Sequence, residues 1–298
     1  MKIIDSHAHL FHCKFDNSFR YMSYDPSSCT FGIEQGDRDS VVKAMKQQGI
    51  AAVIEPGIDL ASNQKLLELA KQHPGWLFPA VGLHPTRTPN EKWKDRGILK
   101  ELTKLPEVIA VGETGLDFHF QRKDQHRMVQ LRWFIFQILL AHHRKLPLVL
   151  HIRQADKMAI PILRLFKPFL HGGVAHCFYG DVSTAQAFIR LGFHLGIGGT
   201  LLQDNEAGET LRETVRQIPL EHLLLETDAP YVHPSCDVIT SGKMRSKVRN
   251  TSLILPAIAQ KIADLKNIDV ETVERQTTQN TIDTFHIKLS QDMAAPAK

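Results

Sequence analysis

The chain has 298 residues, of which 43% are hydrophobic and 23% charged, and its formal net charge is +4. This composition is that of an ordinary soluble globular protein and excludes a largely disordered chain. A net charge this small does not by itself indicate a nucleic-acid-binding protein, so any preference for a polyanion must come from local clusters of basic residues.

The amino-terminal residues predict neither export nor membrane insertion. Only two isoleucines precede the polar segment 5–7, so the apolar region of a signal peptide is missing. The longest apolar block, residues 133–141, is interrupted by Gln137 and is far shorter than the roughly 20 residues that span a bilayer. The four cysteines form no C-x-x-C pair. We therefore expect reduced thiols, a cytoplasmic protein and no membrane partner.

Short apolar strands alternate with amphipathic helices along the chain. The predicted strands cover residues 2–5, 50–54, 77–81, 108–111, 148–150, 173–175, 193–197 and 223–225. The predicted helices cover residues 38–48, 61–73, 91–105, 123–145, 156–166, 183–191, 206–217, 252–265 and 270–285. The polar and aromatic segment 11–37 is expected to form a loop or lid, and residues 289–298 a frayed tail.

This alternation predicts parallel strands joined by crossover helices, and eight strands predict a closed (β/α)8 TIM barrel. The prediction is one domain over residues 1–298, with an extra helix at its carboxyl end. An open doubly wound sheet is the alternative. In its dinucleotide-binding form it needs a glycine-rich turn after the first strand, where this chain has Ser6-His7-Ala8-His9.

Potential metal ligands follow several of these strands. His7 and His9 lie two residues apart, and side chains alternate along a strand, so both point to one side and can chelate a divalent metal. Other strands end at Glu113, His151, His176 and Asp228. In a barrel the carboxyl ends of all strands face one mouth. Four imidazoles and two carboxylates suffice there for two divalent ions, and such a pair promotes hydrolysis.

Five blocks of the sequence resemble the signature blocks of the TatD family of metal-dependent hydrolases, within the amidohydrolase superfamily. The blocks are Asp5–Leu10, Gly112–Asp117, His151–Arg153, His176–Gly180 and Leu225–Tyr231. The likeness extends from residue 2 to about residue 285 and includes Gly82-Leu83-His84-Pro85 and Arg249-Asn250.

The resemblance implies a barrel that hydrolyses phosphodiester bonds of DNA with two divalent ions such as magnesium, manganese or zinc. Matched by position, His7 and His9 would hold one ion, and His151 and His176 the second. Glu113 would bridge both ions. Asp228 would bind the first ion and orient the attacking water or take its proton, so Glu113 and Asp228 are the expected catalytic residues.

Substrate contacts are expected from Arg153, Arg249 and His84. The expected partner is single-stranded DNA as substrate, with trimming from its 3′ end as one form of the activity, and no obligate protein partner is expected. The segment 11–37 is longer than the short loop usual in the family. It would hang over the mouth, where it could narrow the substrate range, order on binding or exclude duplex DNA.

Two other functions stay open at this point. The same metals could hydrolyse a small amide, lactone or phosphoester, because barrel loops vary chemistry without altering the scaffold. The chain could also be a metal-bound scaffold, without activity, in nucleic-acid processing.

Overall fold

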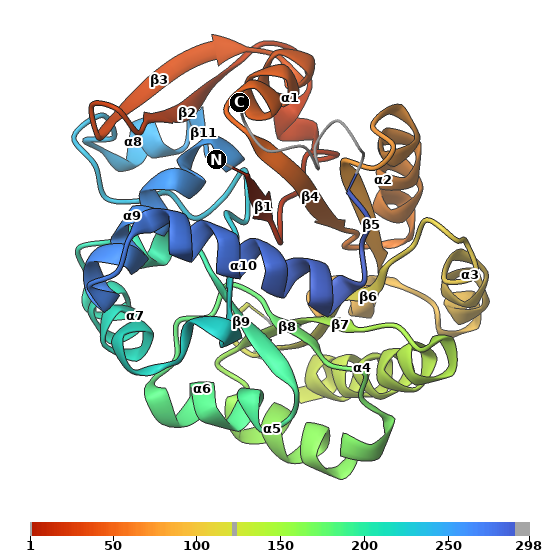
Figure 1. Ribbon diagram of the computed structural model, residues 1–298. Coiled ribbons are helices and arrows are strands. Elements are labelled where there is room, and N and C mark those ends of the chain that lie inside the picture. Colours follow the sequence, from red (N-terminus) through yellow and green to blue (C-terminus); the bar gives the residue numbers. More distant parts are fainter. Residues whose placement is uncertain (1, 121–123, 290–298) are drawn as a thin grey trace.

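The computed structural model describes residues 2–120 and 124–289, and its centre is a parallel sheet of eight strands (Figure 1). Every hydrogen-bonded neighbour pair in this sheet is parallel. The strands are β1 (Ile3–Asp5), β4 (Ile50–Pro56), β5 (Leu77–Val81), β6 (Ala110–Asp117), β7 (Leu148–Arg153), β8 (Gly173–Ala175), β9 (Phe193–Ile197) and β10 (Leu223–Leu225). Each of the eight predicted strands is present.

The first and last strands of the sheet meet, which makes it a barrel. The amide of Ser6 donates to the carbonyl of Leu225 at 2.9 Å, and Ala8 forms a parallel bridge with Ala229. Both contacts lie at the carboxyl ends of β1 and β10. The predicted (β/α)8 barrel is therefore confirmed, and the open doubly wound sheet is excluded.

Helices surround the sheet as the apolar periodicity predicted (Figure 1). They are α1 (Arg38–Gln47), α2 (Leu60–Gln72), α3 (Arg96–Leu102), α4 (Asp124–Arg144), α5 (Asp156–Leu165), α6 (Val182–Ile189), α7 (Glu206–Gln217), α9 (Leu255–Lys266) and α10 (Val270–Phe285). The predicted helix at 91–105 is too long, because α3 is preceded by the 3-10 turn Trp93–Asp95. In that turn Trp93 packs edge-on against Trp133, with ring centroids 5.0 Å apart, so tertiary packing prevails over local helix propensity.

Helix α10 covers the amino-terminal ends of the strands (Figure 1). The hydroxyl of Thr278 donates to the carbonyl of Lys2, and the amide of Asn280 to that of Leu223, each at 2.9 Å. Phe285, the last residue of the helix, and Ile287 just beyond it pack with apolar side chains of the strands in one buried cluster. This end of the barrel is therefore filled, which leaves the carboxyl ends as the open side.

The segment 11–37 contains regular secondary structure, so the prediction of a loop there was wrong, whereas its action as a lid stays a prediction. It begins with the 3-10 turn η1 (Cys13–Phe15) and continues as an antiparallel hairpin of β2 (Phe19–Asp25) and β3 (Thr30–Gly36). Strand β2 also pairs in parallel with β11 (Val248–Arg249), next to the short helix α8 (Gly242–Arg245). The burial of Phe19, Tyr21 and Met22 explains why the segment folds onto the barrel.

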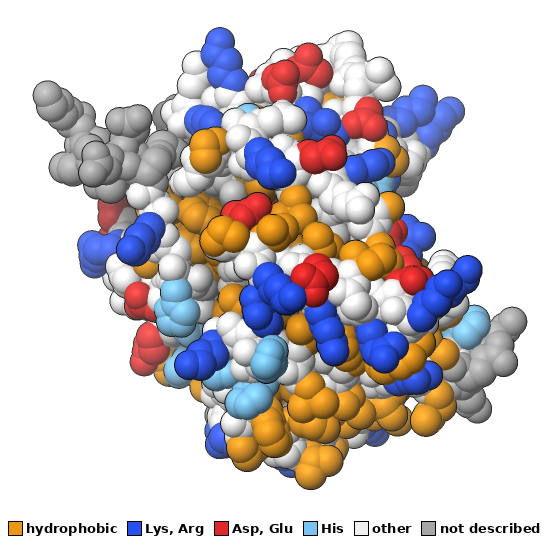
Figure 2. Space-filling model, turned by 90° about the vertical axis from the view of Figure 1, so that its right-hand side faces the viewer, with side chains coloured by type: hydrophobic (Ala, Val, Ile, Leu, Met, Phe, Trp, Pro, Cys, Tyr) orange, Lys and Arg blue, Asp and Glu red, His pale blue; other side chains and the backbone are white. Residues whose placement is uncertain are grey.

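The outer face over α2, α3 and α4 carries a mixture of charges. Figure 2 shows basic side chains interspersed with acidic ones on this face, and hydrophobic side chains between them. Such a mixed surface is typical of a solvated helix layer. No described helix is long and apolar enough to cross a membrane. Most of the tail expected at 289–298 lies outside the described residues.

Candidate metal centre

The carboxyl end of β1 presents His7 and His9 to the barrel mouth. The buried carboxylate of Asp5 holds this turn by accepting hydrogen bonds from the amides of His7 and Thr227, both at 3.1 Å. Its other oxygen accepts from the hydroxyls of Thr227 and Ser252, both at 2.6 Å. The Nε2 atoms of His7 and His9 face each other at 3.2 Å, so both rings point toward one place.

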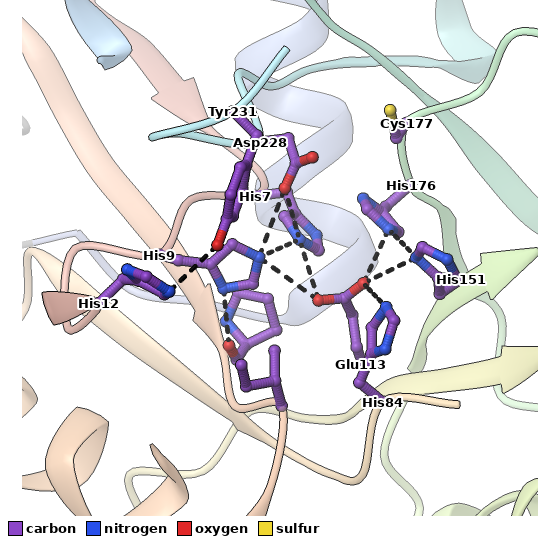
Figure 3. Close-up of polar contacts among 12 residues, drawn as sticks. His7, His9, His12, His84, Glu113, His151, His176, Cys177, Asp228 and Tyr231 are labelled. Carbon is purple, nitrogen blue, oxygen red and sulfur yellow. Dashed lines mark hydrogen bonds and ion pairs between the residues drawn. The ribbon is translucent and has the colours of Figure 1, made fainter. Parts of the chain in front are cut away.

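Glu113, on β6, lies between two pairs of histidines (Figure 3). Its Oε2 atom is 3.5 Å from Nε2 of His7 and 3.4 Å from Nε2 of His9. Its Oε1 atom is 3.0 Å from Nδ1 of His151 and 2.9 Å from Nε2 of His176. One carboxylate thus turns a separate oxygen toward each pair, which is the geometry of a ligand that bridges two ions.

Asp228 follows β10 in an unusual backbone conformation. Its φ of 52° lies in the left-handed region, which a residue other than glycine adopts at an energetic cost and which is common at functional sites. Its amide donates to the carbonyl of His7 at 2.9 Å, so the closure of the barrel holds this conformation. Its Oδ1 atom lies 3.7 Å from Nε2 of His7 and 3.4 Å from Nε2 of His9.

The structure thus brings all six expected ligands to one place, from five strands and the residues that directly follow them; Glu113 and His151 lie within β6 and β7, which continue beyond the predicted strand ends. Among the described residues, three groups of side chains could hold a metal ion: His7 with His9 and Glu113, His84 with Glu113 and His151, and His7 with His176 and Glu226. The ring nitrogens of His151 and His176 converge at 2.9 Å, a separation that needs a shared proton or cation. Buried imidazoles and carboxylates are the donors that divalent transition metals prefer, so the site fits a metal.

The protonation of the metal-free site follows from its burial. Burial lowers the pKa of His7 to about 4, so that ring is neutral, as a metal ligand must be. Burial also acts to lower the pKa of His9, but hydrogen bonding to Asp228 and the charge of Glu113 raise it to about 9. Burial acts to raise the pKa of Glu113, but the surrounding imidazoles hold it well below its usual value. Glu113 is therefore a carboxylate at neutral pH.

Asp117 is a further candidate site residue, one that the sequence patterns did not single out. Its buried carboxylate lies 3.1 Å from Nε2 of His151 and also accepts the amide of Phe120 at 2.8 Å. With its proton on Nε2, His151 turns the lone pair of Nδ1 toward Glu113. A signal was present in the sequence, because Asp117 stands four residues after Glu113 on one strand and so faces the same side.

Removing this carboxylate is expected to weaken metal binding. In Asp117→Ala the ring of His151 loses the partner that fixes its orientation, so metal affinity should fall about 10- to 100-fold. Asp117→Asn, whose amide oxygen can still accept a hydrogen bond, should recover part of the loss. Chelator competition measures the affinity, and the exposed Asp204→Ala serves as the matched control. Equal affinities in Asp117→Ala and the control would contradict this role.

Three residues were expected to contact substrate, and they lie in different surroundings. His84 lies beside the metal ligands, with Nε2 3.5 Å from Oε1 of Glu113. Arg153 lines the cavities at the mouth, and its guanidinium lies 4.9 Å from the ring centroid of Phe120. Arg249 donates to the carbonyl of Lys14 at 3.3 Å and of Ser246 at 3.0 Å, which fixes it at the base of the η1 turn. Their roles toward substrate remain predictions.

Fold and site together define the class of this protein, a metal-dependent hydrolase built on a (β/α)8 barrel. The sequence matches the family described as TatD related DNase over residues 4–286. The chain belongs to this family.

Comparisons with individual proteins agree with this assignment. A protein of Erwinia amylovora named 3′-5′ ssDNA/RNA exonuclease TatD is 36% identical over 246 residues, which cover 82% of this chain and 92% of that protein. YabD of Bacillus subtilis, named as an uncharacterized metal-dependent hydrolase, is 28% identical over 285 residues and covers 96% and 99% of the two chains. The crystal structure of YjjV, a TatD homolog from Escherichia coli, superposes with a TM-score of 0.79 at 24% identity over 96% of this chain and 98% of that one. This last likeness supports the fold.

Proposed function

We propose that this chain is an exonuclease that uses two divalent ions to remove nucleotides from the 3′ end of single-stranded DNA or RNA. The observation that carries the proposal is the position of Glu113, whose two carboxylate oxygens face two separate histidine pairs. The name of the Erwinia relative supports the choice of substrate and of strand end.

In this proposal His7, His9 and Asp228 would hold one ion, and His151 and His176 would hold the other. Glu113 would be shared by the two, and magnesium, manganese and zinc are the candidate metals. When bound, such a pair lowers the pKa of a water molecule and stabilises the charge that develops on the phosphate oxygens.

The side chains around the two ions orient the attacking water, transfer its proton and position the ligands. The carboxylate of Asp228, beside His7 and His9, orients the attacking water and accepts its proton. As the water oxygen bonds to phosphorus, the bond from phosphorus to the nucleoside oxygen of the neighbouring nucleotide breaks, and the proton passes on to that oxygen. Asp117 keeps the ring of His151 in position throughout.

The test is digestion of a 5′-labelled single-stranded oligonucleotide by the purified full-length protein. We expect a ladder that shortens from the 3′ end when magnesium, manganese or zinc is present, and an intact strand after chelation. The same preparation is assayed in parallel on small ester, lactone and amide substrates. Metal-dependent turnover of a small substrate with intact DNA and RNA would assign the site to the other class of hydrolase, and the nuclease proposal would then be wrong.

A further inference from the structure

The open side of the barrel is divided into two lobes that meet at the metal centre. One lobe is a cavity of about 330 Å³ bordered by Tyr179, Thr200 and Gln203. The other is a cavity of about 450 Å³ bordered by Thr86, Arg87, Phe120 and Tyr231. Residues common to both borders are His151, Arg153, His176, Asp228 and Val232. A phosphate held at the metal centre therefore has one lobe on each side of it.

Among the described residues, few cations border the smaller lobe. Arg153 belongs to both lobes, and it is the one Lys or Arg among the described residues that border the smaller one. The remaining polar groups of this border include the hydroxyls of Tyr179 and Thr200 and the amides of Gln154 and Gln203. Such groups suit the sugar and base of a nucleoside rather than a second phosphate.

The larger lobe is bordered by cations from separate segments. Arg87 lies on its border with an exposed side chain. Lys14 lies at the rim, where its ammonium nitrogen is 4.0 Å from the ring centroid of Tyr231. Within residues 2–120 and 124–289, no carboxylate forms an ion pair with Lys14 or Arg87. Cations without an acidic partner beside a phosphate-cleaving site are suited to bind a further phosphate.

Lys14 is held in place before any ligand arrives. Nδ1 of His12 accepts the Lys14 amide at 3.0 Å, so the proton of a neutral His12 is on Nε2, which lies 3.1 Å from the hydroxyl of Tyr231 (Figure 3). The contact of the Lys14 ammonium with the Tyr231 ring is a cation–π interaction.

The η1 turn that carries Lys14 is anchored by the residues just before it and by its own last residue, Phe15. The amide of Phe11 donates to the buried carboxylate of Glu55 at 2.6 Å, and Arg38 donates to the carbonyl of Leu10 at 2.8 Å. Phe15 is buried with 1% of its surface exposed. The turn is therefore anchored rather than hinged, and its charge needs little reorganisation to meet a ligand.

Resting on the proposed nuclease activity, we infer that Lys14, held over Tyr231, and Arg87 bind the phosphate next to the scissile one, so that the larger lobe takes the retained strand. The smaller lobe then takes the terminal nucleoside. The terminal nucleotide has no phosphate beyond the scissile one, whereas the retained strand has one for each further nucleotide. The positions of Lys14 and Arg87, the cations that the described part of the chain adds to the larger lobe alone, match this difference.

The experiment compares a dinucleoside monophosphate, which has only the scissile phosphate, with a trinucleotide and a hexanucleotide. Lys14→Gln should lower kcat/KM on the trinucleotide about tenfold more than on the dinucleoside monophosphate, because one charge-assisted contact is removed. The salt slope of log kcat/KM on the hexanucleotide should decrease by about 0.7 in magnitude, as expected for one phosphate contact to a single strand. Lys14→Arg should keep most of the wild-type kcat/KM on the longer substrates and most of the wild-type salt slope.

Lys43→Gln, which removes the same charge from the exposed face of α1, is the matched control and should keep the wild-type length dependence and salt slope. Tyr231→Leu removes the ring beneath Lys14. Like Lys14→Gln, it should lower kcat/KM more on the longer oligonucleotides than on the dinucleoside monophosphate. A loss in Lys14→Gln that is equal on all three substrates overturns the inference while the nuclease activity stands. Failure of the wild-type protein to cleave any of the strands overturns the proposed function instead.

Discussion

Glu113→Gln is expected to lower the nuclease activity by at least about a thousandfold, which corresponds to ~4 kcal/mol of transition-state stabilisation. The amide keeps the size of the side chain, but its NH2 group cannot act as a ligand, so one of the two histidine pairs loses its shared oxygen. The variant should also bind fewer metal ions than the wild-type protein. Metal analysis of the purified protein and the oligonucleotide assay measure the two effects.

The control for this variant is Glu209→Gln, which makes the same chemical change on the exposed surface of α7. Circular dichroism spectra of both variants should match the wild-type spectrum, because glutamine keeps the size and shape of the glutamate side chain. Retention of both ions and of activity in Glu113→Gln would refute the bridging role.

Asp228→Asn is expected to reduce kcat by about a thousandfold, within the range usual for the loss of a general base. The asparagine oxygen can still face His7 and His9, but the amide cannot accept a proton from water. The effect should therefore fall on kcat more than on metal content. Steady-state kinetics and metal analysis on one preparation separate these two quantities.

Asp237→Asn is the matched control, because Asp237 is exposed on the loop that follows Asp228 and carries the same functional group. It should keep the wild-type kcat. If Asp228→Asn instead keeps kcat and loses an ion, Asp228 is a ligand alone, and the proton acceptor must be sought elsewhere in the mouth.

The barrel could be predicted because its signals are local. Each strand is a short apolar run, and each helix such as α10 (Val270–Phe285) shows its own periodicity, so both are visible in a window of a few residues. The hairpin of β2 and β3 was missed for the opposite reason. Strand β2 pairs with Val248 and Arg249, more than two hundred residues further along the chain, and no local pattern specifies that pairing.

The candidate ligands could be chosen from sequence because strand-end residues of a barrel share one mouth, whatever the lengths of the connections. The contacts that other residues make behind and beside these ligands could not be predicted from the sequence. The pairing of Asp117 with His151 depends on the register of β6 against β7, and the contact of Lys14 with Tyr231 depends on how the η1 turn meets the loop after β10.

By itself the sequence determined the fold, the family resemblance and the set of side chains available for metal binding, since these follow from residue type and periodicity along the chain. Only the tertiary structure decided that each oxygen of Glu113 faces a different histidine pair, and that among the described residues Lys14 and Arg87 lie at the larger lobe of the mouth. The physical reason is that closing the barrel brings together the ends of distant strands. Distances of a few ångströms between them are fixed by packing and strand register over the whole chain.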